Sequence, residues 1–129
     1  YRTSFLQKNK DYICLEATFK LKKGNKEEIE ELVKIRKRRR VESQPLEYPS
    51  AGSVFRNPSV ETPAGKLIDD LGYKGLTKGG AQVSGKHANF IVNIGNAKAS
   101  DIKDLIEFIQ ERVEENYNIK FLKFQYLFV

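Results

Sequence analysis

The sequence predicts an α+β protein, with a small antiparallel or mixed sheet and helices packed on one face. Two observations carry this prediction. Residues 11–21 alternate apolar and polar side chains, which is the period of a half-buried strand, and further short runs suit strands. Other segments place apolar residues at helical spacing next to capping residues. From residue 50 onward the predicted elements follow the order β-α-β-β-α-β, and a strand and a helix precede them.

The N-terminal third is predicted to hold one strand and one helix. Residues 11–21 alternate, so we expect a half-buried strand with Cys14 as buried filler rather than a nucleophile. Asn25 followed by Glu28 matches a helix N-cap, and the helix should reach about Arg40. Its end is followed by a linker at residues 44–48. We therefore place a domain boundary there, which gives domains 1–43 and 44–129.

The remaining elements follow from turn and cap residues. Val54 and Phe55 suit a strand that Pro58 ends. Thr62 is the expected N-cap of a short helix that Gly72 closes. Further elements are strands at residues 81–84 and 89–94, a long helix with Ser100 as N-cap, and a final strand at residues 119–129.

Composition narrows the classes of function. The 129 residues carry a net charge of +6, but the densest basic cluster (Lys34 to Arg40) closes a segment that opens with glutamates. That order suits a solvated helix end better than a nucleic-acid patch. No apolar run is long enough for a membrane span, and the first residues do not show the pattern of a signal peptide. A single cysteine and a single histidine exclude an internal disulfide and give no metal-site spacing, so we expect a reducing, cytoplasmic setting. Methionine is absent even at position 1, which predicts a piece of a longer protein.

Ser53 is the candidate reactive residue. It lies where a tight loop of small residues, Ser50 to Gly52, becomes a strand. Such a junction places a side chain on a rigid support, and the small neighbours allow a ligand to approach closely. By residue type alone, the simpler interpretation of this stretch is a strand flanked by turns.

Four sequence motifs resemble one enzyme family. They are PSAGSVFRNP at residues 49–58, AGKLIDDLGYKG at 64–75, GGAQVSGKHANFIVN at 79–93 and NAKASDIKDLI at 96–106. In this order they resemble UDP-N-acetylenolpyruvoylglucosamine reductase, also called UDP-N-acetylmuramate dehydrogenase, of peptidoglycan precursor synthesis. The segments YRTSF at 1–5 and LEATFKL at 15–21 resemble the stretch upstream in that family.

The resemblance implies a flavoenzyme in which NADPH reduces bound FAD, and hydride then passes to the enolpyruvyl group of the UDP-sugar. Two N-terminal lobes hold FAD in the family. Residues 1–43 would therefore be the last part of the FAD-binding lobe, and residues 44–129 the substrate-binding lobe. The missing N-terminal lobes would be the chain's partners.

The resemblance also implies roles for individual residues. Ser53 matches the proton donor. Tyr1 and Asn57 match contacts to the substrate diphosphate, Gln44 lies near a lysine with that role, and His87 falls at a polar substrate contact. Without the resemblance, these four would be a chain end, a turn former, a linker residue and a surface-loop histidine. Arg56 lies on the same strand but should point away from the site.

Two catalytic residues of the family are not matched. One is an arginine expected upstream of Tyr1. The other is a glutamate in the last strand, where this sequence has Phe124. We therefore expect the chain alone to be incapable of the full reaction. Two alternatives remain open: a non-catalytic lobe that binds sugar nucleotides, and a basic nucleic-acid-binding domain using residues 34–40.

Overall fold

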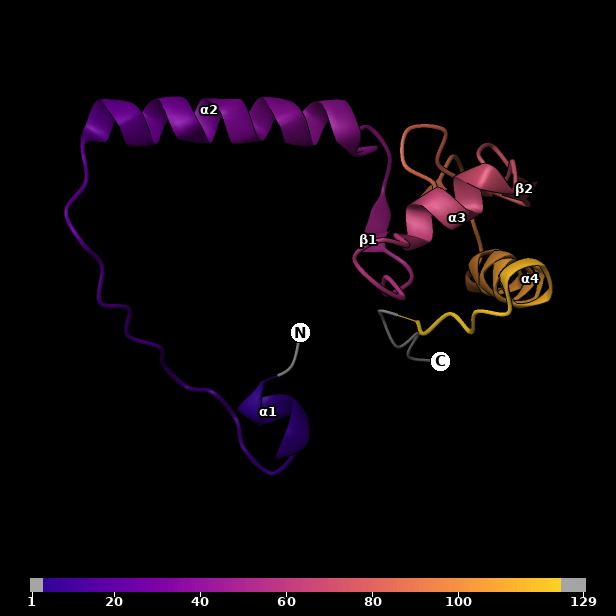
Figure 1. Ribbon diagram of the computed structural model, residues 1–129, viewed down its shortest axis with the longest axis horizontal. Coiled ribbons are helices and arrows are strands. Elements are labelled where there is room, and N and C mark those ends of the chain that lie inside the picture. The colour runs from indigo at the N-terminus through magenta and orange to yellow at the C-terminus, as the bar shows by residue number, and fades with distance from the viewer. Residues whose placement is uncertain (1–3, 124–129) are drawn as a thin grey trace. The chain divides into compact units, whose positions relative to one another are not determined.

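The computed structural model describes residues 4–123, and Figure 1 traces them. The chain divides into two compact units, Tyr1–Val33 and Lys34–Val129. The second unit contains the sheet and the candidate site. Within the described residues, no helix is both long and apolar enough to cross a membrane.

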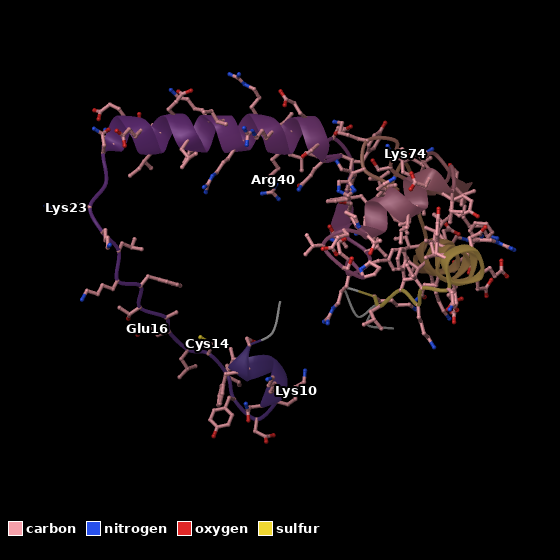
Figure 2. All side chains as sticks on the ribbon, viewed as in Figure 1. Lys10, Cys14, Glu16, Lys23, Arg40 and Lys74 are labelled. Carbon is pink, nitrogen blue, oxygen red and sulfur yellow. The ribbon has the colours of Figure 1, made fainter. Side chains whose placement is uncertain are left out.

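The first unit holds α1 (Phe5–Lys8) and the start of α2 (Lys26–Ser43). The strand predicted at residues 11–21 is wrong, since residues 12–25 contain neither helix nor strand. The apolar side chains of this segment are exposed, Leu15 by 94%, and Cys14 is exposed rather than buried (Figure 2). Alternation alone does not form a strand, because a strand also needs a partner for its backbone hydrogen bonds.

The predicted cap of α2 is confirmed. The Glu28 backbone N–H donates to Asn25 Oδ1 at 3.1 Å, which satisfies one of the helix's unpaired amides. The helix continues past the expected Arg40 to Ser43, whose hydroxyl donates to the Arg39 carbonyl at 2.8 Å.

The second unit confirms the predicted fold class. Four antiparallel strands form one sheet in the order β1-β4-β3-β2. The strands are β1 (Ser50–Ser53), β2 (Thr77–Lys78), β3 (Ala81–Val83) and β4 (Phe90–Asn93), and the helices are α3 (Ala64–Asp70) and α4 (Ala99–Tyr117).

One hydrophobic core joins the sheet to both helices. Val83 and Ile91 belong to the same buried cluster as Ile68 of α3 and Ile109 of α4. The apolar residues of α3 and α4 recur every three or four positions, so each helix turns one stripe toward this cluster. This packing supports β1 and β4, the strands that carry the site.

β1 contains a bulge immediately before Ser53. Ser50 pairs with Val92 and Ser53 pairs with Phe90, so three steps along β1 match two along β4. Gly52, inside the bulge, has a φ of 87°, a conformation that residues with a Cβ rarely adopt. A bulge redirects the side chains that follow it. The predicted strand at residues 54–55 thus lies earlier, at Ser50–Ser53.

Two helix starts and the last strand differ from prediction. α3 begins at Ala64 with Pro63, not Thr62, as N-cap, and α4 begins at Ala99 with Lys98, not Ser100, as N-cap. The Lys98 backbone N–H donates a hydrogen bond to Asp101 Oδ2 at 2.9 Å. Of the final strand, the described residues 119–123 show only an isolated bridge between Lys123 and Phe55. Residues 124–129, including Phe124, lie outside the described residues.

Candidate functional site

Ser53 lies at the junction of two open clefts. It is half-buried at the end of β1, directly after the bulge. It lines both a cleft of about 430 Å³ toward α3 and a cleft of about 580 Å³ toward residues 40–49. Ala51 and Gly52 line the second cleft beside it and add almost no side chain. A ligand could therefore reach the Ser53 hydroxyl from either cleft.

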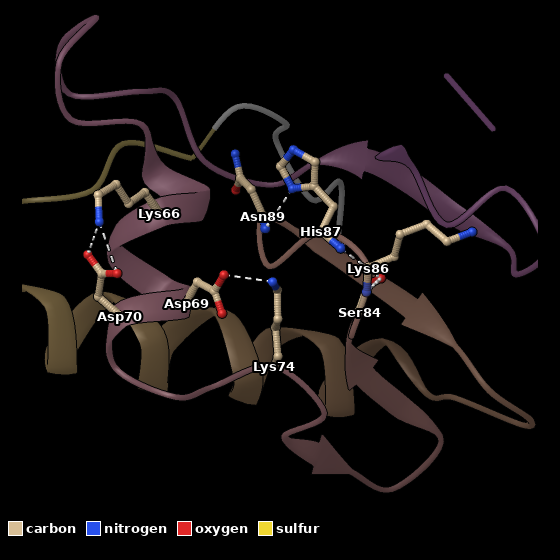
Figure 3. Close-up of polar contacts among 8 residues, drawn as sticks. All are labelled: Lys66, Asp69, Asp70, Lys74, Ser84, Lys86, His87 and Asn89. Carbon is tan, nitrogen blue, oxygen red and sulfur yellow. Dashed lines mark hydrogen bonds and ion pairs between the residues drawn. The ribbon is translucent and has the colours of Figure 1, made fainter. Parts of the chain in front are cut away.

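Asn57 and His87 share the first cleft with Ser53. Figure 3 shows His87 and Asn89 of this cleft above the Asp69–Lys74 ion pair, with the Lys66–Asp70 pair to one side. Three residues predicted from distant parts of the sequence are thus brought together. Tyr1 lies outside the described residues.

Asn57 serves the fold as well as the cleft. Its Oδ1 accepts a hydrogen bond from the Ala64 N–H at 3.1 Å, which caps the first turn of α3. Because the oxygen is engaged by this donor, the amide NH₂ is the group left to face a ligand. Such a group can donate to a phosphate oxygen.

His87 is held as a neutral donor. Its Nδ1 accepts a hydrogen bond from the Asn89 N–H at 3.2 Å, and its ring centroid lies 4.9 Å from that of Phe90. Burial lowers the pKa of His87, and the positive charge of Lys74 lowers it further. The accepting nitrogen must be unprotonated, so the ring proton resides on Nε2.

Gly65 lets His87 approach α3. A Cβ at Gly65 would lie 3.0 Å from His87 Cε1, which is closer than most real contacts allow. The absence of a side chain at Gly65 therefore leaves room for the His87 ring beside α3.

Gln44 lines the second cleft together with Arg40. Arg40 Nε donates to Gln44 Oε1 at 3.1 Å, so the two side chains form one polar unit at the end of α2. The sequence predicts a solvated helix end for residues 34–40. Arg40, the last residue of this segment, also places a cation in the wall of the second cleft. The other guanidinium N–H groups of Arg40 suit phosphate oxygens.

The cations of the first cleft are paired with acids. Lys66 lies 2.7 Å from Asp70, and Lys74 lies 2.6 Å from Asp69. The hydrogen bonds that Lys66 donates to Asp70, together with the negative charge of that carboxylate, raise the pKa of Lys66. These carboxylates neutralise part of the positive charge that the two lysines bring to the first cleft.

The sequence did not single out several residues that build this site. Arg40, Gly65, Lys74 and Asn89 all line or shape the clefts. Gly65, Lys74 and Asn89 lie within the motifs that resemble the family, but none of the four was assigned a role in the site. Only their spatial proximity to Ser53 shows that they contribute to the site. Among residues 4–123, no group of three or more His, Cys, Asp or Glu side chains is placed to bind a metal ion.

Comparison with known proteins decides the family. The family model for the C-terminal domain of UDP-N-acetylenolpyruvoylglucosamine reductase matches residues 44–123. The chain belongs to the UDP-N-acetylenolpyruvoylglucosamine reductase family. A relative of that name from Fervidobacterium nodosum is 52% identical over 120 residues, covering 93% of this chain and 39% of its own length. One from Bacillus pumilus is 49% identical over 120 residues, with the same 93% and 39% coverage.

A solved structure agrees. The crystal structure of UDP-N-acetylenolpyruvylglucosamine reductase from Thermus caldophilus is similar with a TM-score of 0.65 and 42% identity, covering 79% of this chain and 36% of that one. The chain spans 39% of the length of the Fervidobacterium nodosum and Bacillus pumilus relatives. The family and the fold follow from these matches.

Proposed function

We propose that the chain is the C-terminal portion of a flavin-dependent reductase that converts UDP-N-acetylenolpyruvoylglucosamine to UDP-N-acetylmuramate with NADPH in cytoplasmic peptidoglycan synthesis. The observation that carries the proposal is the convergence of Ser53, Asn57 and His87 on one cleft. Family membership supplies the chemistry that this cleft would serve.

The wall beside Ser53 suits the close approach of a flavin ring rather than the binding of the whole cofactor. Ala51 and Gly52 leave the wall beside Ser53 almost bare, so a planar ring could lie close to the hydroxyl. FAD, when bound, would transfer to the substrate the hydride that NADPH supplies. We propose that the N-terminal lobes, with residues 1–43 as their last part, hold most of the cofactor.

Ser53 would deliver the proton that completes the reduction. Hydride adds to one carbon of the enolpyruvyl double bond, and the electron pair moves onto the neighbouring carbon, which takes the proton from the Ser53 hydroxyl. A serine is a weak acid, so this step needs an alkoxide stabilised by nearby donors and a fixed geometry. The rigid β1–β4 pairing at Ser53 and Phe90 supplies the geometry.

The remaining predicted residues would hold the sugar nucleotide. Asn57 would donate its NH₂ to the diphosphate and His87 its Nε2–H to an uncharged acceptor. Gln44, beside Arg40, would lie near the diphosphate, with the guanidinium providing the charge. Tyr1 remains a proposed diphosphate contact on sequence resemblance.

Reconstituted turnover tests the proposal. The full-length protein that contains this chain should oxidise NADPH in the presence of FAD and the enolpyruvyl UDP-sugar. Ser53→Ala should lower that turnover by about 100-fold or more while reduction of the flavin by NADPH persists. Ser100→Ala, at the exposed start of α4, serves as the matched control and should keep full turnover.

Two results would contradict this function. One is equal loss of flavin reduction and substrate reduction in Ser53→Ala, which would indicate a folding role. The other concerns residues 1–129 alone, which we propose are inactive. Turnover by this chain near that of the full-length protein would refute this part of the proposal.

A second function, a lobe that binds sugar nucleotides without catalysis, is favoured by the same cleft residues. It predicts binding of the UDP-sugar in the absence of FAD and no NADPH oxidation at all.

A further inference from the structure

Asn89 forms a buried link behind Ser53. Its side chain donates from Nδ2 to the Phe55 carbonyl and accepts from the Phe55 N–H at Oδ1, both at 2.9 Å. Its main-chain carbonyl accepts the Val54 N–H at 2.9 Å. Three hydrogen bonds from one residue thus fix the two residues that follow Ser53.

The same residue fixes the opposite wall of the cleft. The Asn89 N–H donates to His87 Nδ1 at 3.2 Å, and Figure 3 shows this bond at the top of the cleft. The loop before it is held by Ser84, whose hydroxyl accepts from the N–H groups of Lys86 and His87 at 3.1 and 3.3 Å. Asn89 therefore contacts both the strand that carries Ser53 and the ring of His87.

Burial makes this link difficult to replace. Asn89 is 4% exposed and Phe55 is 2% exposed, so water has little access to the polar groups between them. A residue that cannot both donate and accept would leave a buried Phe55 group without a partner. Only a carboxamide, or a protonated carboxyl, offers both functions in the space of this side chain.

We propose that Asn89 is a positioning residue that fixes Ser53 and His87 in one geometry for reduction of the UDP-sugar. This inference rests on the proposed function for its catalytic readout. Its structural part, the restraint of residues 53–56, does not depend on that function. An error in placement of about 1 Å can reduce a rate about 100-fold, which sets the expected size of the effect.

The kinetic test uses Asn89→Asp in the full-length protein. At a pH high enough to ionise the introduced carboxyl, this group accepts from the Phe55 N–H but cannot donate to the Phe55 carbonyl, so kcat should fall about 100-fold. At low pH the protonated carboxyl regains the donor. The ratio of variant to wild-type kcat should therefore rise as pH falls, which general loss of structure would not produce.

A double-mutant cycle tests whether Asn89 acts through Ser53. In the Ser53→Ala background, Asn89→Asp should lower the residual rate much less than 100-fold, because the group that it positions is already gone. Val113→Ala is the stability control: Val113 is fully buried in α4, distant in sequence from the link. It should lower stability and leave kcat unchanged. Full additivity with Ser53→Ala, or an equal loss of kcat in Val113→Ala, would overturn the proposal.

Amide hydrogen exchange gives a readout that needs no activity. Asn89→Leu should raise the exchange of residues 53–56 relative to both the wild type and Val113→Ala. If the wild-type protein does not reduce the UDP-sugar but exchange rises at residues 53–56, the proposed function fails and the positioning of Ser53 stands. Unchanged exchange at residues 53–56 overturns the positioning role whatever the activity.

Discussion

The bulge of β1 gives the sharpest test of how the fold presents Ser53. Gly52 has a φ of 87°, and an alanine at such an angle costs about 1–3 kcal/mol in backbone strain. Two responses to Gly52→Ala are possible. The fold can keep the bulge and lose that free energy of unfolding. Alternatively it can remove the bulge, which shifts the register by one residue and turns Ser53 to the other face of the sheet.

Stability and turnover are therefore both measured in this variant. We expect Gly52→Ala to lower the free energy of unfolding by about 1–3 kcal/mol in urea titration. We also expect turnover of the full-length protein to fall about 100-fold, because Ser53 is displaced from the reacting carbon. Flavin reduction by NADPH should persist.

Gly75→Ala is the matched control. Gly75 has a φ of 82°, close to that of Gly52, and nothing lies within 4 Å of an added Cβ. It should show the same loss of stability with unchanged turnover. Wild-type stability and turnover in Gly52→Ala would refute the role of the bulge, and so would an equal loss of turnover in Gly75→Ala.

Two further variants test the site and the core. His87 has a folded-state pKa below its ordinary value of 6.5, so the unfolded chain binds more protons there, and stability should fall as pH drops below about 6.5 and through the folded-state pKa. Urea midpoints at about pH 7.5 and 5.5 should show this loss in the wild type and a smaller one in His87→Asn; equal losses would contradict it. Phe121 is 2% exposed with its ring centroid 4.9 Å from that of Phe55, so Phe121→Ala should cost about 3–5 kcal/mol of unfolding free energy. Leu122→Ala, at a side chain 61% exposed, should cost less than about 0.5 kcal/mol, and similar losses in both would argue against this packing.

Local patterns in the sequence predicted much of the second unit. The helical stripe ending at Val113 and the apolar run of β4 depend on periodicity, which a sequence shows directly. Gly72 was expected to close α3, and it has the positive φ of 74° that this position needs. These features are set by residues a few positions apart.

Features set by distant residues could not be predicted. The cap of α3 comes from Asn57, seven positions before Ala64, rather than from Thr62. Asn89 looks like the polar start of an apolar strand, and only the fold shows that it holds Phe55, 34 positions away. The alternating segment 11–21 shows the opposite case. Its pattern is clear, but the described residues provide no partner strand to pair with it.

The candidate site, like the fold, could be predicted from the sequence only in part. Resemblance to the family identified Ser53, Asn57 and His87, and the fold places all three on one cleft. Arg40 was assigned to a solvated helix end because its neighbours in sequence are charged, yet it lines the cleft that Gln44 shares with Ser53. The contribution of a charge to a site depends on where the helix ends in space, which the sequence does not show.

Mapping the bound substrate on the protein tests the central claim most directly. The full-length protein, labelled for amide NMR, would be titrated with UDP-N-acetylenolpyruvoylglucosamine without NADPH. We expect amide shifts to concentrate at Ser53, Asn57, His87 and Gln44, and those of Thr77 and Lys78 in β2 to stay unchanged. Saturable binding with shifts confined to β2 and α4, and none at Ser53, would contradict it.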